Sequence, residues 1–288
     1  MKKIDRIYNP PRPHWVGDGF HVHTFFPSQE ISIKRMSPFL LLDYNAKMRV
    51  APAEKQRGVG VHPHKGFETV TFAFHGKVAH HDSAGHAGVI GEGDVQWMTA
   101  GSGVLHKEYY EKEFSKKGGD FQMVQLWVNL PSKDKSANPR YQPLVGDQMK
   151  KYILPGEMGT VKVFAGEYKG VKGSANTFSH VQLFVFHLKE GAKEDFEIPE
   201  TENTSLLLLE GAAEVNGESA NMNQLVLFKN EGIKISLQAE EETTVLLMSG
   251  TPIDEPIAAY GPFVMNTYTQ IDQAFHEFSS GKYGYLED

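Results

Sequence analysis

Short runs of β-forming residues, separated by turn residues, recur along most of this 288-residue chain. Residues 67–74 (FETVTFAF), 121–130 (FQMVQLWVNL) and 181–188 (VQLFVFHL) are rich in β-branched and aromatic side chains. Comparable runs occupy residues 205–209, 224–228, 233–237 and 243–248. Gly, Asn, Asp and Pro interrupt them at intervals of roughly 8–15 residues, as in sandwiches and barrels. The pattern predicts an all-β fold.

Two parts of the chain also resemble each other. Residues 67–83 resemble residues 203–219 when Gly76 is placed opposite Gly211, which shifts the alignment by one residue before the glycines, and each segment reads as an apolar strand, a glycine turn and a second strand. An offset of about 130 residues indicates a duplicated β domain. At a prior of about 150 residues per domain, the length also favours two domains. We expect one domain over 1–135 and another over 136–288, with residues 133–141 beginning the connection.

One amphipathic helix is predicted near the C-terminus. Apolar residues recur there at i, i+3, i+4 and i+7: Ile271, Ala274, Phe275 and Phe278. Thr269 and Asp272 have the spacing of a capping box, and Gly281 is a suitable stop. The helix is expected to pack on a barrel.

Composition and charge exclude several classes of function. The chain has no cysteine, so any metal ion must be held by histidine and carboxylate side chains. A net charge of −7 disfavours direct nucleic-acid binding, which needs a surplus of basic residues. No apolar run is long enough for a membrane helix, and no signal peptide follows the two N-terminal lysines. We therefore expect a cytoplasmic location and no membrane partner.

The residues that carry chemistry lie in two short segments. His62 and His64 are two residues apart, so on an extended strand both imidazoles point to one face. His106 and Glu108 have the same spacing about forty residues later. Two such strands facing one interior would present three imidazoles and one carboxylate. That set suits Fe(II), Mn(II), Ni(II), Cu(II) or Zn(II).

The other histidines have simpler interpretations. His21 and His23 share the two-residue spacing but lack a second pair, and we expect a surface or packed pair. His80 and His81 are adjacent, so at most one of them faces inward. Packed or solvated positions are expected for the remaining histidines of this kind: His75, His86, His180 and His187.

Three longer segments together are similar to the pirin family. They are HPHKGFETVTF from His62, HHDSAGHAGVIGEGDVQWMTAGSGVLHKE from His80, and FQMVQLWVNLP from Phe121. The resemblance extends over nearly the whole chain. It implies two cupin barrels, a C-terminal helix and one metal ion, usually iron, in the N-terminal barrel.

The resemblance also implies a ligand set, which falls on His62, His64, His106 and Glu108. Glu68 has the position of the ordinary cupin carboxylate. Because pirins take their carboxylate from the second motif, we expect Glu68 to lie behind the ligands, and it remains a rival ligand. In the second half the corresponding positions are Glu197 and Pro199, with Ser236 and Gln238 near the others, so no second metal site is expected.

Flavonol (quercetin) 2,3-dioxygenase activity is the function that the resemblance implies first. The flavonol 3-hydroxyl would bind the metal, Glu108 would take its proton, and O₂ would open the central ring with release of carbon monoxide. The alternative is a regulator that binds transcription factors or metabolic enzymes according to the oxidation state of the metal. Residues 108–119, interpreted as a charged loop at the pocket mouth, would serve such contacts. A cupin isomerase or an inactive protein is a third reading, because one fold supports many functions.

Overall fold

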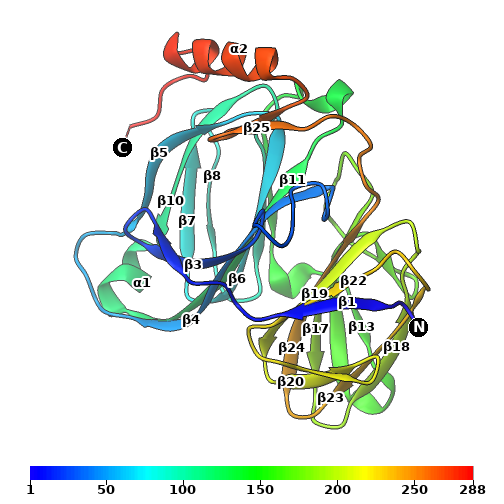
Figure 1. Cartoon of the computed structure of the whole chain (residues 1–288). Helices are drawn as coiled ribbons and strands as arrows, with labels where there is room; N and C mark the ends of the chain where they lie inside the picture. Colours follow the sequence, from blue (N-terminus) through cyan, green and yellow to red (C-terminus); the bar gives the residue numbers. More distant parts are fainter. Residues whose placement is uncertain (288) are drawn as a thin grey trace. The chain divides into compact units, whose positions relative to one another are not determined.

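The computed structural model describes residues 1–287, which form two compact units (Figure 1). The first barrel comprises residues 12–34, residues 39–147 and the chain from 253 on. The second barrel comprises residues 1–11, 35–38 and 148–252. Strands dominate both units, so the predicted all-β fold is confirmed. Among the described residues, no helix has the length and apolar character that spanning a bilayer would require.

Two antiparallel sheets make up the first barrel. The seven-stranded sheet runs in the order β12 (Arg140–Leu144), β9 (Val95–Thr99), β6 (Phe67–His75), β11 (Gly119–Asn129), β4 (Phe39–Val50), β3 (Phe20–Phe26) and β2 (His14–Val16). The four-stranded sheet runs in the order β5 (Gly58–His64), β10 (Val104–Tyr110), β7 (Val78–Asp82) and β8 (Ala87–Ile90). A hairpin of β25 (Ala258–Tyr260) and β26 (Phe263–Met265) and the helices α1 (Lys112–Lys117) and α2 (Tyr268–Ser279) complete this unit.

The second barrel repeats this plan. Its larger sheet has the order β1 (Ile4–Tyr8), β22 (Leu225–Phe228), β19 (Asn203–Glu210), β24 (Thr243–Gly250), β17 (Val181–Leu188), β14 (Gly159–Ala165) and β13 (Lys151–Ile153). The smaller sheet contains β18 (Lys193–Glu197), β23 (Lys234–Ala239), β20 (Ala212–Val215) and β21 (Glu218–Asn221). A short ribbon of β15 (Glu167–Tyr168) and β16 (Val171–Lys172) stands beside them.

The predicted duplication is confirmed strand by strand. β6 and β19 have the same place in the two larger sheets, and so do β9 and β22. Gly76 and Gly211 each follow their strand with a positive φ, 79° and 75°, a conformation that favours glycine. Asn216 and Gly217 form a tight hairpin between β20 and β21, with both residues at positive φ.

The chain is divided differently from the boundary expected at 135/136. β1 pairs with β22 and takes the edge position that β12 holds in the first barrel. At the other end, the segment from 253 returns to the first barrel, where the backbone N–H of Val264 donates to the carbonyl of Lys65 at 3.1 Å. Buried Lys135 donates to the carbonyls of Gly66 and Val264. Strand pairing between distant segments, and not continuity along the sequence, therefore decides to which barrel a segment belongs.

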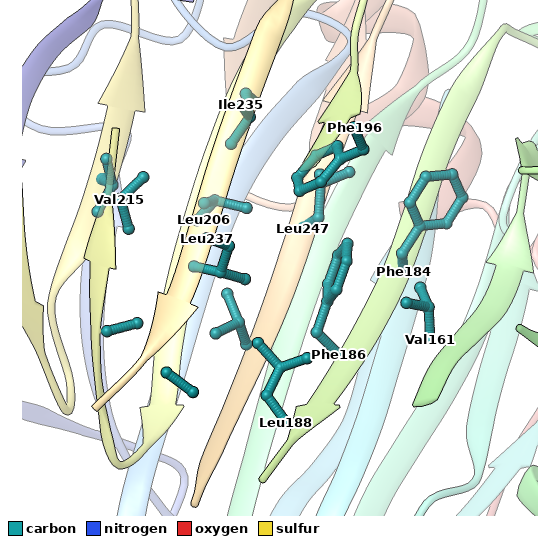
Figure 2. Packing of buried hydrophobic residues seen from close by; sticks show 14 of the residues in the cluster. Val161, Phe184, Phe186, Leu188, Phe196, Leu206, Val215, Ile235, Leu237 and Leu247 are labelled. Atoms are coloured by element: carbon teal, nitrogen blue, oxygen red, sulfur yellow. The ribbon is translucent and has the colours of Figure 1, made fainter. Parts of the chain in front are cut away.

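The interior of the second barrel is filled with apolar side chains (Figure 2). Inward positions on β17 and β14 carry Phe184, Phe186 and Val161, which pack against Leu206 and Leu247 from β19 and β24. These side chains are at most 1% exposed. Burying apolar surface of this extent is the main stabilising contribution to such a unit.

Helix α2 forms as predicted, but its cap and its buried face differ. The capping box joins Thr267 to Gln270, and not Thr269 to Asp272. Glu277 is buried, whereas Phe278 is 40% exposed. The reason is an ion pair, because Glu277 accepts from the ammonium of Lys65 at 2.8 Å and so turns this side of the helix toward the barrel. Gly281 follows the helix end with φ 76°, as a stop residue should.

The prediction of a charged loop over residues 108–119 is wrong, because this segment has regular secondary structure. Residues up to Tyr110 belong to β10, and Lys112–Lys117 form the helix α1. The carboxylate of Glu111 accepts from the backbone N–H groups of Glu113 and Phe114, both at 3.0 Å, and so caps the helix. The connection expected to begin at residues 133–141 is also partly wrong, because residues 140 and 141 belong to β12 of the first barrel.

Replacing Thr267 by alanine tests the observed cap of α2. We expect Thr267→Ala to destabilise the helix by about 1 kcal/mol, since it removes the side-chain acceptor for the Gln270 N–H. Thr269→Ala is the matched control and should change little. Amide hydrogen exchange over residues 268–279 measures the difference. Equal effects of both substitutions would contradict this assignment.

Candidate metal centre

The pairing of β5 with β10 brings three imidazoles together. His106 lies directly opposite His62 in the strand register, and His64 is two residues further along β5 on the same face. Ring centroids are 4.8 Å apart for His62 and His64, 4.2 Å for His62 and His106, and 4.7 Å for His64 and His106. One ring nitrogen from each residue lies within 4.8 Å of the other two. The three predicted histidines therefore converge.

Hydrogen bonds leave the correct nitrogen atoms available for an ion. Nδ1 of His62 lies 2.8 Å from the carbonyl oxygen of Gly60, and Nδ1 of His64 lies 3.3 Å from that of Pro262. Since a carbonyl only accepts, both rings carry their proton on Nδ1 and keep the Nε2 lone pair. Nε2 of His106 is buried without a hydrogen-bond partner in the described chain. Two imidazoles with an unprotonated Nε2 and a third whose Nε2 has no hydrogen-bond partner form a donor set that suits a divalent metal ion.

Burial keeps these imidazoles neutral. It lowers the pKa of His64 and His106 well below the ordinary value of 6.5, and the neighbouring imidazoles lower it further. The pKa of His62 is also lowered, again mainly by burial. Neutral imidazole is the form that binds metals, so the cluster needs no deprotonation at neutral pH.

Glu108 lies beside the cluster and is held from the opposite sheet. Its carboxylate groups with His106 and His80 within 4.8 Å, and it is not part of the group that contains His62 and His64. Oε2 accepts from the amide of Gln125 at 2.7 Å, and Oε1 accepts from Gln96 and, at 3.2 Å, from Thr71. Three donors from β11, β9 and β6 thus fix the orientation of this buried carboxylate.

Glu68 does not join the cluster. Side chains alternate along β6, so Glu68 and Thr71 point to opposite faces, and Thr71 is the one that reaches Glu108. The Glu68 carboxylate instead accepts from Thr99 at 2.6 Å and lies 3.7 Å from the guanidinium of Arg140. The structure therefore does not place Glu68 behind the imidazoles, and it contributes to neither group of ligand atoms.

A cavity of about 240 Å³ opens against the imidazoles of His62 and His64. Its polar wall contains His62, His64, Glu108, Gln125 and Asp43. The remaining wall is mainly apolar and is formed by Val16, Phe20, Val22, Val59, Met123, Trp127, Gly261 and Pro262. Burial raises the pKa of Asp43, and the hydroxyl of Thr24 donates to its carboxylate at 2.5 Å. A small, mostly apolar cavity beside a ligand cluster has the form of a binding site.

Several site residues were beyond sequence reasoning. Gln125 and Thr71 are two of several polar residues in β11 and β6, and only their meeting at Glu108 gives them a role. Gln96 faces Glu108, whereas Trp97 is on the other face of β9 and fully buried. Pro262 was assigned to the other domain. Polar side chains at inward positions of the predicted strands were the available signal.

The remaining histidines lie outside the three-imidazole cluster. His80 is buried and His81 is exposed, as their adjacency predicted. His21 stacks on Trp15 with 4.7 Å between ring centroids, and His23 lies near Tyr44. Apart from His80, none of these histidines belongs to a group of potential ligands in residues 1–287.

The second barrel has different residues at the equivalent strands. The aligned positions Glu197 and Gln238 are exposed and point outward. The inward positions of β18 and β23 instead include Phe196, Ile235 and Leu237, which belong to the apolar core (Figure 2). These side chains offer no ligand atoms.

Glu68 provides a test of the electrostatics of the first barrel. Burial raises its pKa to about 7, although Thr99 and Arg140 oppose the shift. Between pH 4.5 and 7 the folded state therefore binds more protons than the unfolded state, and this contribution to stability falls as pH rises, by roughly 3 kcal/mol in total. Glu68→Gln should lose that dependence.

Tryptophan fluorescence suits the measurement, because Trp15, Trp97 and Trp127 all belong to the first barrel. In urea unfolding, the free energy of unfolding of Glu68→Gln minus that of the unmodified chain is expected to increase from pH 4.5 to pH 8. A difference between the two proteins that is the same at both pH values would contradict the raised pKa.

Comparisons with known proteins agree with this fold. A family model described as "Pirin" matches residues 19–128, and one described as "Pirin C-terminal cupin domain" matches residues 183–284. A Pseudomonas aeruginosa protein, provisionally named quercetin 2,3-dioxygenase PA2418, is 44% identical over 283 residues, covering 98% of this chain and 99% of that protein.

Solved structures match as well. The crystal structure of a quercetin 2,3-dioxygenase from Acinetobacter baumannii has a TM-score of 0.94 and 45% identity, with 100% of both chains covered. The bacterial pirin YhhW from Escherichia coli, solved in complex with nickel(II), shares the fold at 20% identity, with a TM-score of 0.63 over 86% of this chain and 100% of that chain. With both family models and these relatives matched, the chain belongs to the pirin family of bicupin proteins.

Proposed function

We propose that this pirin is a metal-dependent dioxygenase that cleaves a flavonol such as quercetin with O₂. The observation that carries the proposal is the convergence of His62, His64 and His106, of which the first two line a largely apolar cavity. The names of the Pseudomonas and Acinetobacter relatives support the reaction class. The cytoplasmic location expected from the sequence is part of the same proposal.

His62, His64 and His106 would hold the ion through Nε2, and Glu108 is the proposed fourth ligand. Iron(II) is the proposed ion, and Mn(II), Ni(II), Cu(II) or Zn(II) also suit these donors. A bound ion would supply Lewis-acid and electron-transfer chemistry at the cavity wall. Glu108 shares its group with His106 and not with His62 and His64, so a small movement of its side chain is part of this proposal.

Glu108 is also the proposed proton acceptor. Its carboxylate lines the cavity, where a phenolic hydroxyl of a substrate can reach it. Gln96, Gln125 and Thr71 keep the carboxylate oriented while they donate to it. A positioned base of this kind contributes about 10²–10⁴-fold to a rate.

The rest of the cavity suits a flat aromatic molecule. Phe20, Val22, Met123 and Trp127 provide apolar contacts, and Asp43 offers an acceptor for a further hydroxyl. The volume of about 240 Å³ is slightly below the ~300–1,000 Å³ typical of small-molecule sites. It therefore favours a single small aromatic substrate over a larger conjugate.

The regulatory alternative keeps the same metal centre and gives it a different role. Residues 108–119, the segment on which this alternative was based, form the end of β10 and the capped helix α1. Within this segment only Glu108 lines the cavity. A partner that depends on the oxidation state of the metal stays a prediction from the family resemblance.

Oxygen uptake with quercetin tests the proposed reaction. Iron-loaded protein mixed anaerobically with quercetin and then aerated should consume O₂ and release carbon monoxide. Glu108→Gln should lower the rate by 10²-fold or more, because the amide cannot accept the proton. Uptake no faster than with the same concentration of free iron would reject the dioxygenase.

Metal content tests the ligand set separately. His62→Ala and His64→Ala should each reduce the bound metal to less than a tenth of an equivalent, because two imidazoles do not complete the set. His21→Ala is the matched control from the other two-residue histidine pair, and it should retain one equivalent. Full occupancy in either of the first two variants would refute the assignment.

A further inference from the structure

His106 differs from the other two imidazoles in what its Nδ1 atom meets. His62 and His64 place Nδ1 against backbone carbonyls, which can only accept a hydrogen bond and therefore determine the tautomer. Nδ1 of His106 instead lies 3.5 Å from Nδ1 of His80, which can either donate or accept. The tautomer of His106 therefore depends on that of His80.

Asp82 determines the tautomer of His80. Oδ1 of Asp82 accepts from the backbone N–H groups of Ala84 and His86, both at 2.9 Å, which favours the ionised carboxylate. Oδ2 lies 3.3 Å from Nε2 of His80. Since a carboxylate only accepts, the proton of a neutral His80 belongs on Nε2. Its Nδ1 then has a free lone pair toward His106.

The consequence for His106 is direct. It must donate from Nδ1 to His80, and its Nε2 then keeps a lone pair. That Nε2 is buried without a hydrogen-bond partner among residues 1–287. His80 thus does for His106 what the two carbonyls do for His62 and His64.

We propose that His80 is a positioning residue of the metal centre, which, anchored on Asp82, accepts from Nδ1 of His106 and keeps Nε2 of His106 free to bind the ion. The inference rests on the proposed metal centre of His62, His64 and His106. Hydrogen bonds from the non-ligating nitrogen to such an outer acceptor fix the ring orientation and raise ligand basicity, and their loss commonly weakens metal binding 10–100-fold.

The surroundings of His80 hold its ring in place. The side chain is fully buried, so water cannot easily replace it as an acceptor. Tyr141 stacks on the ring with 5.0 Å between centroids and 20° between planes. The hydroxyl of Tyr141 donates to Gln96 at 3.2 Å, and Gln96 in turn donates to Glu108. The contacts of His80 with His106 and Asp82, at 3.5 and 3.3 Å, are longer than ordinary hydrogen bonds, so they depend on the ring being held in this plane.

The same distances also allow His80 itself to be a ligand, because His80, His106 and Glu108 form a second group within 4.8 Å. A neutral imidazole has one lone pair, however. In His106 this lone pair cannot be on Nε2, for an ion shared with His62 and His64, and also on Nδ1, for an ion shared with His80. The positioning role is therefore favoured over a second ion.

Zinc titration of the full chain tests the proposal, with Zn²⁺ alone as the probe because it is diamagnetic and redox-inactive. His80→Phe keeps the ring but removes the acceptor, and it should weaken zinc binding about 10–100-fold. His80→Asn places an amide oxygen near the former Nδ1 and should recover most of the affinity. His81→Phe is the matched control, since His81 is exposed on the other face of β7 and contacts Tyr109.

Nitrogen-15 NMR of His106 separates positioning from a general loss of structure. In the unmodified apo protein and in His80→Asn, His106 should be protonated on Nδ1. In His80→Phe the Nε2–H tautomer should appear. If His80→Phe does not fold, as judged by tryptophan fluorescence, the tautomer of His106 in Asp82→Ala supplies the same comparison.

The outcomes distinguish this inference from the proposed function. Failure of the unmodified chain to bind zinc would overturn the metal centre itself. Unchanged affinity and tautomer in His80→Phe, with one zinc bound to the unmodified chain, would overturn only the role of His80. Two zinc ions per chain that fall to one in His80→Phe would also overturn it, because His80 would then be a ligand.

Discussion

The register between β5 and β10 is the constraint on which the site depends. It places His106 opposite His62, and the two-residue spacing places His64 beside them. Packing three imidazoles together is tolerated because burial lowers their pKa values and keeps them uncharged. A shift of the register by one residue would turn the histidines of one strand to the opposite face and disperse the cluster.

Two barrels with the same strand order differ in what their interiors contain. The first directs imidazoles, a carboxylate and amides inward, and the second directs Phe, Leu, Ile and Val. Each buried polar group in the first barrel needs a partner, and the cross-strand contacts of Glu108 with Gln96, Gln125 and Thr71 provide it. One topology therefore supports either a chemical site or an apolar core, depending on the inward residues.

Segments remote in sequence complete the first barrel. The carbonyl of Pro262 orients His64, and the ion pair of Lys65 with Glu277 fixes α2. In the second barrel, β1 closes the edge of a sheet whose other strands begin about 140 residues later. The site consequently depends on the C-terminal segment as well as on the two histidine motifs.

The sequence by itself determined the β-rich architecture, the duplication around Gly76 and Gly211, and the two histidine motifs, because alternation along a strand and two-residue spacing are local properties. It misplaced the helix cap, the ends of the domains and Glu68, and it gave His80 no role. Only the tertiary structure decided these, because edge-strand pairing, the buried Lys65–Glu277 pair and the partners of a lone polar residue depend on chain segments that meet after folding. Local patterns do not encode which distant strand supplies such a partner.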